Sequence, residues 1–384
     1  MLIFIILSGY DINISRNLLT NDFLLYLAIK TIIKKYINVI ISFILLRIKF
    51  MKNEFILSII FFLCFFFLSH KAIASDCEFQ MADMNWPSAT LMANVDKFIL
   101  EEGFGCKVEL IPGATTATFV TMNEKGRPQV APELWTNSVA EPLQKAMQEG
   151  RLFSASEGPI TDLGEGWWVT PETLQRNPKF KTVLDILKRP DLFPAKEDPT
   201  KGEFIGCPAG WGCQLSNQSL FIAFEMEKKG WILVDPGSKA GLDASMTKAA
   251  QRGDNWFGYY WSPTSLIGKY NMKLIDFGIP FAGSENWDSC ISKGPEICIN
   301  PKATAWTEST VKTIVTPKVK EMHKVMKYFS KRIFPGEVMN SMLVYMEDNQ
   351  AQGTDGAITF LERYSEIWTS WIPKEVAQKV KKAL

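Results

Sequence analysis

Residues 206–213 read Gly206-Cys207-Pro208-Ala209-Gly210-Trp211-Gly212-Cys213. A tryptophan stands on a glycine-rich loop between two cysteines, and a helical pattern follows directly over residues 215–229. Gly212 and Cys213 open this helix, so their backbone N–H groups are free and point outward. Helix N-termini bind anions such as carboxylates without a charged side chain. We therefore expect the loop to present an indole face beside an anion site.

A second segment, Tyr259-Tyr260-Trp261-Ser262-Pro263, ends an aromatic run on another tryptophan. A quaternary ammonium ligand requires flat, electron-rich faces around its cation and hydrogen-bond donors around its anionic end. The two segments together supply both.

Strands and helices alternate along the rest of the chain. The pattern predicts strands over 78–82, 106–111, 129–134, 256–261 and 273–277, and helices over 89–102, 215–229, 322–329 and 355–371. This alternation is typical of an α/β fold with a parallel or mixed sheet covered on both faces. On the 215–229 helix, Leu215, Ile222 and Met226 are the expected buried face.

Four tryptophans fall where ligands bind in such folds, beyond the carboxyl ends of strands. Trp86 and Trp135 follow the first and third predicted strands, Trp261 closes its own strand, and Trp211 lies on a loop before a helix. The other tryptophans are assigned to packing: Trp167, Trp168, Trp231, Trp256, Trp287, Trp306, Trp368 and Trp371.

The N-terminal part has the pattern of a targeting segment. Residues 51–74 contain Lys52, an apolar run over 56–68 and the cleavage motif Ala72-Ile73-Ala74, as in a secretory signal peptide. The alternative is a membrane anchor, for which the run is short. We expect Met51 to be the true start and residues 1–50 to be a spurious or non-structural extension. The alternative there is a lysine-interrupted membrane segment over about 23–50.

Charge and cysteine content limit what residues 75–384 can be. The whole chain has 42 Lys/Arg and 41 Asp/Glu, of which residues 1–74 hold eight and three, so the remainder has a net charge of about −4. This charge argues against a nucleic-acid partner.

Without Cys64, six cysteines remain, an even number that predicts three disulfides in an exported chain. Proximity pairs Cys207 with Cys213 and Cys290 with Cys298. Cys77 and Cys106 remain, and each stands at the start of a predicted strand, so adjacent parallel strands would bring them together as the third pair. A C-x-x-C redox motif and the paired spacings of a zinc site are both missing from the sequence.

An exported hydrolase is the main alternative class, and it requires paired carboxylates. Glu133, Asp162, Glu165 and Asp254 are available, but isolated acidic residues beside loops are usually solvated or capping groups. The sequence has no G-x-S-x-G or H-E-x-x-H motif, and His323 is the only histidine after residue 74. We therefore expect a binding protein and not an enzyme. A ligand-sensing domain tethered by residues 1–74 is a further alternative.

From about Cys77 onward, the chain resembles the periplasmic glycine betaine/proline betaine-binding proteins of ABC importers, within the OpuAC-like group that includes choline binders. The segments over 206–213 and 259–263 and Leu134-Trp135-Thr136 carry the resemblance. It implies a box of Trp135, Trp211 and Trp261 around a trimethylammonium group. It also implies carboxylate binding by the N–H groups of Gly212 and Cys213. Trp86 is a candidate additional wall.

The resemblance also implies an α/β, two-lobed clamshell of the type II-like periplasmic-binding-protein class. Each lobe is expected to be a mixed sheet flanked by helices. Lobe one would comprise 75–170 and 309–384 and lobe two 171–308, with hinge crossings near 166–170 and 309–316. The implied partners are a small onium or zwitterionic solute and the permease and ATPase subunits of an importer. A monomer in the periplasm, without cofactor or metal, is expected.

One position departs from the family. Close members have a histidine four residues after the first box tryptophan, where this chain has Val139, with Asn137 and Ser138 nearby. Because no histidine is expected at the site, we predict that affinity for a zwitterion is nearly flat from about pH 6 to 8. A choline-type or dimethylsulfoniopropionate-type ligand is the alternative to a betaine.

Overall fold

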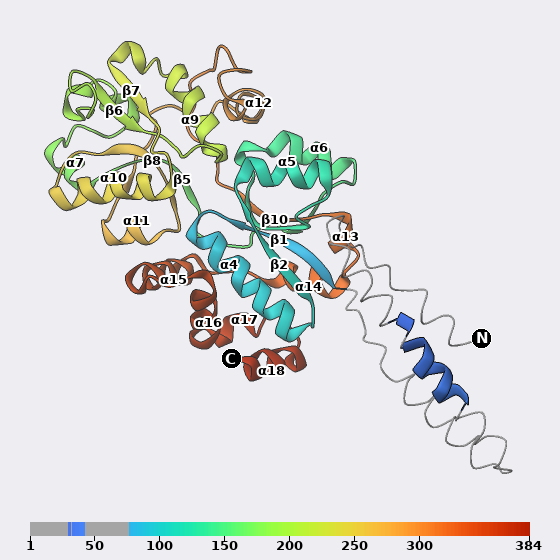
Figure 1. Ribbon diagram of the computed structural model, residues 1–384. Coiled ribbons are helices and arrows are strands. Elements are labelled where there is room, and N and C mark those ends of the chain that lie inside the picture. Colours follow the sequence, from blue (N-terminus) through green and yellow to red (C-terminus); the bar gives the residue numbers. More distant parts are fainter. Residues whose placement is uncertain (1–29, 32, 43–76) are drawn as a thin grey trace. The chain divides into compact units, whose positions relative to one another are not determined.

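The computed structural model of the protein describes residues 30–31, 33–42 and 77–384 (Figure 1). The chain divides into two compact units, residues 1–74 and 75–384. The described residues of the first unit are helical. The expected signal peptide over 51–74 lies outside the described residues. Among those described, no helix combines the length and apolar character needed to cross a membrane.

The second unit contains two mixed sheets of five strands. The first has the order β2-β1-β3-β10-β4, with β1 (Glu78–Met84), β2 (Lys107–Gly113), β3 (Val130–Trp135), β4 (Phe153–Ser156) and β10 (Val311–Val315). β1 pairs in parallel with both β2 and β3, whereas β10 is antiparallel to β3 and β4. Every residue of β3 is buried, as in strands covered on both faces.

Helices cover the first sheet, and together they form lobe one. They are α4 (Pro87–Phe98), η1 (Ile99–Gly103), α5 (Thr115–Lys125), η2 (Thr136–Ser138), α6 (Ala140–Gln148), α13 (Pro317–Lys320), α14 (His323–Lys331), α15 (Gly336–Asn349), α16 (Gly353–Arg363), α17 (Ser365–Trp368) and α18 (Lys374–Ala383). α16 packs against α4, and α18 packs against η1, so the C-terminal segment completes the lobe that the N-terminal segment begins (Figure 1).

The second sheet has the order β7-β6-β8-β5-β9 and belongs to lobe two. Its strands are β5 (Gly164–Val169), β6 (Gly202–Ile205), β7 (Trp231–Val234), β8 (Phe257–Ser262) and β9 (Lys273–Leu274). β6 is parallel to β7 and β8, and β5 is antiparallel to β8 and β9. The helices of this lobe are α7 (Pro171–Arg176), α8 (Val183–Ile186), η3 (Pro190–Leu192), α9 (Gly212–Ala223), η4 (Glu227–Lys229), α10 (Lys239–Arg252), α11 (Ser265–Lys269), α12 (Ser284–Ser289) and η5 (Ile291–Lys293).

The core of lobe two is aromatic. Trp167 is fully buried, and its ring lies 4.5 Å from that of Phe204 and 5.0 Å from that of Phe277. Aromatic side chains each bury a large apolar area, which stabilises a lobe of modest size. The packing role predicted for Trp167 is therefore confirmed.

The change from one lobe to the other occurs at different residues than expected. The first crossing was predicted near 166–170, but β5 over Gly164–Val169 already pairs with β8 in the second sheet. The chain therefore leaves the first sheet after Ser156 and joins the second at Gly164. The second crossing was predicted at 309–316, yet β10 lies wholly within the first sheet, so this crossing precedes Val311. The predicted lobe limits at residues 170 and 309 shift accordingly.

Three predicted elements differ in extent. The helix predicted over 215–229 runs over Gly212–Ala223, and Ile222 is 44% exposed, contrary to its predicted place on the buried face. The helix predicted over 355–371 is interrupted at Tyr364 between α16 and α17. The strand predicted over 273–277 is only two residues long. Tertiary contacts override local periodicity at these positions.

The structure contains the three predicted disulfides, Cys77–Cys106, Cys207–Cys213 and Cys290–Cys298. Glu78 pairs with Lys107 in the parallel register of β1 and β2, so the two preceding cysteines meet at the strand starts. Their Cα atoms are 4.6 Å apart.

Candidate functional site

The predicted binding residues converge on one cavity between the two lobes. All six line it: Trp86, Trp135, Trp211, Gly212, Cys213 and Trp261. Seven further residues complete the lining: Thr115, Asn137, Ser138, Glu165, Ser216, Tyr259 and Trp306. The space open to water-sized molecules in this cavity is about 30 Å³.

The aromatic walls come from separate elements. Trp86 precedes α4 and Trp135 ends β3 in lobe one, whereas Trp211 precedes α9 and Trp261 lies in β8 of lobe two. The ring of Trp211 lies 5.5 Å from that of Trp86 at 73° and 5.0 Å from that of Trp261 at 82°. Both contacts are edge-to-face, a geometry that aromatic pairs favour.

Hydrogen bonds of the indole N–H groups fix three of these rings. Trp211 Nε1 donates to Asn85 Oδ1 of lobe one at 2.8 Å, which joins the two lobes. Trp86 and Trp135 both donate to Oε1 of Glu133, at 2.7 and 2.9 Å. Each donor is thus satisfied within the protein, and the rings are held in place.

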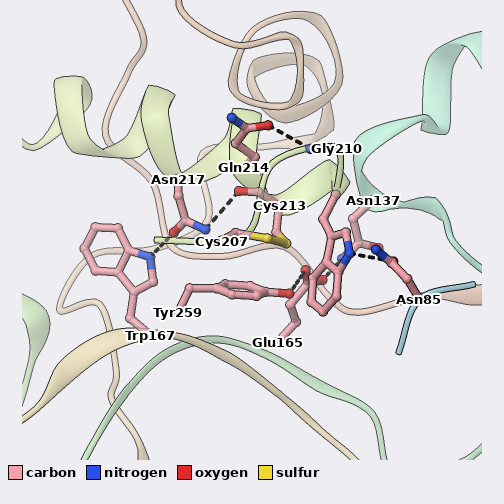
Figure 2. Close-up of a disulfide and its surroundings, with 11 residues drawn as sticks. Asn85, Asn137, Glu165, Trp167, Cys207, Gly210, Cys213, Gln214, Asn217 and Tyr259 are labelled. Atoms are coloured by element: carbon pink, nitrogen blue, oxygen red, sulfur yellow. Dashed lines mark hydrogen bonds between the residues drawn. A yellow bond between two sulfur atoms is a disulfide. The ribbon is translucent and has the colours of Figure 1, made fainter. Parts of the chain in front are cut away.

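Hydrogen bonds of Asn217 and a disulfide hold the start of α9 in place. Asn217 accepts a hydrogen bond from the buried Trp167 Nε1 at 2.7 Å and donates to the Cys213 carbonyl at 2.9 Å (Figure 2). Gly210 N donates to Gln214 Oε1 at 3.1 Å, and the Cys207–Cys213 disulfide closes the loop (Figure 2). A side chain that reaches into the aromatic core therefore orients the first turn of the helix.

The N–H groups of Gly212 and Cys213 have no acceptor within residues 77–384, as expected for the first turn of a helix. Thr115, the first residue of α5, also lines the cavity from lobe one. Two helix N-termini, one from each lobe, therefore meet at the cavity. Both carry partial positive charge.

Gly212 lies directly against Ser138 of lobe one. A Cβ atom built on it would lie 1.8 Å from Ser138 Oγ and 2.3 Å from Ser138 Cβ. These separations are far below van der Waals contact, so no larger residue fits here while the lobes are closed.

Glu165, expected from the sequence to be a solvated or capping group, lines the cavity. Tyr259 OH donates to its Oε1 at 2.7 Å, and Asn137 Nδ2 of lobe one donates to its Oε2 at 3.0 Å (Figure 2). Burial raises the pKa of Glu165 to about 7, although the hydrogen bonds from Tyr259 and Asn137 oppose this rise. The cavity therefore contains an acid that titrates near neutral pH.

The remaining predictions have mixed outcomes. Glu133 is fully buried and hydrogen-bonded, unlike the solvated group that was expected, whereas Asp162 and Asp254 are exposed as predicted. Trp306 was assigned to packing but lines the cavity. Val139, at the position of the family histidine, is 5% exposed and packs in the hydrophobic core.

A larger hollow of about 880 Å³ lies in lobe two beside β6, β7 and α10. Its lining mixes charges of both signs, such as Arg176, Lys196, Glu203 and Asp235, and none of the predicted binding residues reaches it. The aromatic cavity is therefore the candidate site.

Comparison with known proteins agrees with this geometry. Residues 78–363 match the OpuAC family, described as the substrate binding domain of ABC-type glycine betaine transport systems. The chain belongs to this family. Members are substrate-binding transport proteins and not enzymes, act outside the cytoplasm, and work with the permease and ATPase of an ABC importer.

Solved structures share the OpuAC fold. The glycine betaine/L-proline-binding protein ProX of Borrelia burgdorferi is 16% identical, with a TM-score of 0.61 over 79% of this chain and 99% of that one. Lactococcal OpuAC, closed on glycine betaine, is 16% identical, with a TM-score of 0.57 over 77% and 100%. A choline-binding protein in complex with choline is 16% identical, with a TM-score of 0.60 over 80% and 97%. A search of curated protein sequences finds no match. At this identity, the likeness shows the two-lobed fold alone.

Proposed function

We propose that residues 75–384 form a periplasmic solute-binding protein that captures a methylated onium osmolyte of the glycine betaine/proline betaine class. The protein would deliver this solute, as a monomer, to the permease and ATPase of an ABC importer. The observation that carries the proposal is the convergence of Trp135, Trp211 and Trp261, with Trp86 beside them, on one cavity. Export by the signal peptide over 51–74 belongs to the same proposal.

The cavity has the two features that a zwitterionic onium compound requires. The indole faces would attract the cation, at about 0.5–2 kcal/mol for each contact. The free N–H groups of Gly212 and Cys213 would bind the carboxylate at the α9 N-terminus. Together these contacts are consistent with micromolar affinity, about −8 kcal/mol.

A choline-type ligand is the second candidate, and one observation favours it. Glu165 contributes a carboxyl group to the cavity, and an ionised carboxyl favours a ligand with a net positive charge. The glycine betaine of OpuAC and the choline of the related binding protein are accommodated in the same fold.

Replacing Trp135, Trp211 or Trp261 by Ala tests the proposal. Each variant should bind glycine betaine or choline at least tenfold more weakly, about 1.4 kcal/mol, because one cation–π wall and its packing are lost. Isothermal titration calorimetry on the purified variants measures the change.

Ile222→Ala is the matched control, because Ile222 projects from α9 away from the cavity and is 44% exposed. This variant should bind like the unmodified protein. If two of the three tryptophan variants retain full affinity while remaining folded by circular dichroism, the assignment of the box is wrong.

A further inference from the structure

Behind the aromatic walls lies a carboxylate that does not line the cavity. Glu133 is fully buried in β3, two residues before Trp135. Its Oε1 accepts three hydrogen bonds, from Trp86 Nε1 at 2.7 Å, Trp135 Nε1 at 2.9 Å and Ser88 Oγ at 2.9 Å. One oxygen atom therefore fixes the orientation of two indole rings that come from different elements.

Glu133 shares its surroundings with one buried base, Arg332, which also pairs with the buried Asp96. Arg332, also fully buried, attracts Glu133 and forms an ion pair with Asp96, with 3.1 Å between Nε and Oδ1. Two buried acids thus share one guanidinium group. Burial raises the pKa of Glu133, and hydrogen bonds from Trp135, Trp86 and Ser88 and attraction to Arg332 oppose this rise. The second oxygen of each acid, Glu133 Oε2 and Asp96 Oδ2, has no hydrogen-bond partner among the described residues, so the three hydrogen bonds to Oε1 and the attraction to Arg332 are what favour the charged form of Glu133.

A hydrogen bond from an indole N–H group to an anion changes the electron density of the ring in addition to fixing its position. When an indole N–H donates to a carboxylate, electron density moves into the ring and its face becomes more negative. Attraction between a cation and an aromatic face depends on that negative potential. Glu133 is positioned to have this effect on Trp86 and Trp135 at once.

We propose that Glu133 is a positioning residue of the onium site, which orients Trp86 and Trp135 and strengthens their attraction for a cation through the shared hydrogen bonds. This inference rests on the proposed function, since it concerns the same cavity. It predicts that Glu133 contributes to recognition of the ligand's positive charge specifically, and much less to recognition of its shape.

The test uses Glu133→Gln, which retains an oxygen that can accept from both indoles but has no charge. Two pairs of probes differ only in the charged atom: choline with 3,3-dimethylbutan-1-ol, and glycine betaine with 3,3-dimethylbutanoate. The variant should bind the onium member at least fivefold more weakly and change affinity for the carbon isostere less than twofold. Glu109→Gln, which removes an exposed carboxylate of β2, is the control and should change neither.

A second measurement does not depend on ligand affinity. In ¹H–¹⁵N NMR spectra, the indole protons of Trp86 and Trp135, assigned with Trp86→Phe and Trp135→Phe, should move upfield in Glu133→Gln because their hydrogen bonds weaken. Where an isostere binds too weakly for its affinity to be measured, these chemical shifts still show whether the charge of Glu133 strengthens the two indole hydrogen bonds.

Equal loss of affinity for onium and isostere would reduce Glu133 to a packing role and overturn the inference. Unchanged onium affinity or unchanged indole shifts would also overturn it. Failure of the unmodified protein to bind any onium compound would instead contradict the proposed function.

Discussion

Glu165 has the largest consequence of any single residue in the cavity. Its carboxyl group contacts both lobes, through Tyr259 of β8 and Asn137 after β3. Because the pKa of Glu165 is raised to about 7, its charge changes within the physiological range. The affinity for a zwitterion was predicted to be nearly flat from about pH 6 to 8 because no histidine is expected at the site. Glu165 is a second kind of group that titrates in this range, so the absence of histidine is not a sufficient reason for a flat profile.

The affinity for choline should rise with pH. A cation favours the ionised carboxylate. A pKa of about 7 makes Glu165 mostly protonated at pH 6 and mostly ionised at pH 8, which allows up to about a tenfold change in the affinity for choline.

The raised pKa of Glu165 also affects stability without ligand. The folded protein should lose stability as the pH rises from about 4.5 to 7, because the carboxyl group ionises at lower pH in the unfolded chain than in the folded one.

Calorimetry of choline binding at pH 6, 7 and 8 measures the effect. Glu165→Gln should abolish the slope, because the amide does not titrate in this range. If this variant and the unmodified protein show the same slope, Glu165 is not its source.

The sequence allowed four of the five tryptophans that line the cavity to be predicted, because each of the four lies where a readable strand or helix begins or ends. The roles of Glu133 and Glu165 were not predictable in the same way. A carboxyl group is solvated or buried according to partners far along the chain, and Tyr259 is 94 residues from Glu165. Trp306 lies in an irregular segment whose course no periodic pattern indicates.

At the scale of elements, the first turn of α9 combines a disulfide, a polar anchor and a glycine that meets the opposite lobe. The buried residues of this helix are mostly small or polar, including Ser216, Asn217 and Ser219. Its position and the free N–H groups at its start were predicted from glycine and helix periodicity. The buried face of α9 was not predicted. It packs against η2 and η5 through small and polar residues, so the sequence has no apolar stripe that would indicate these contacts.

Gly212→Ala should weaken ligand binding by at least tenfold, about 1.4 kcal/mol, because its methyl group would collide with Ser138 when the lobes close. The fold of each lobe should be unaffected, since the collision is between lobes. Calorimetry and thermal unfolding together distinguish the two effects.

The double variant Gly212→Ala/Ser138→Gly provides the control. Without the Ser138 side chain, the nearest remaining atom is Thr115 Cγ2 at 3.6 Å, an ordinary contact, so affinity should recover in large part. Absence of recovery would contradict a steric cause.

At the scale of the whole binding unit, contacts join the lobes both at the cavity and away from it. At the cavity, Asn137 of lobe one accepts a hydrogen bond from Trp287 Nε1 at its carbonyl and donates one to Glu165, and both of these partners belong to lobe two. Away from the cavity, Lys269 of α11 pairs with Glu347 of α15 at 3.1 Å. The clamshell class was predictable from the family motifs. The crossing points were not, because the sequence pattern predicted no strand over Gly164–Val169, where the chain joins the second sheet.

Lys269→Met should weaken ligand binding only slightly, by up to about fivefold, because an exposed ion pair contributes about 0–1 kcal/mol to the closed arrangement. The effect should shrink at high salt, since exposed charges are screened. Titrations at low and high ionic strength measure it.

Lys228→Met is the comparison, because Lys228 pairs with Glu225 at 2.7 Å within lobe two. That variant should bind like the unmodified protein. A loss greater than tenfold for Lys269→Met, or an equal loss for both variants, would show that the lobe contact does not act as described.

The edge-to-face tryptophan contacts also have an optical consequence. Indoles 5.0–5.5 Å apart couple their electronic transitions, and Trp86 and Trp211 belong to different lobes whereas Trp211 and Trp261 belong to one. Opening the lobes would break the first coupling and preserve the second. The near-ultraviolet circular dichroism of the protein therefore contains a component that exists only while the lobes are together. The walls of the cavity are also an intrinsic, label-free reporter of closure.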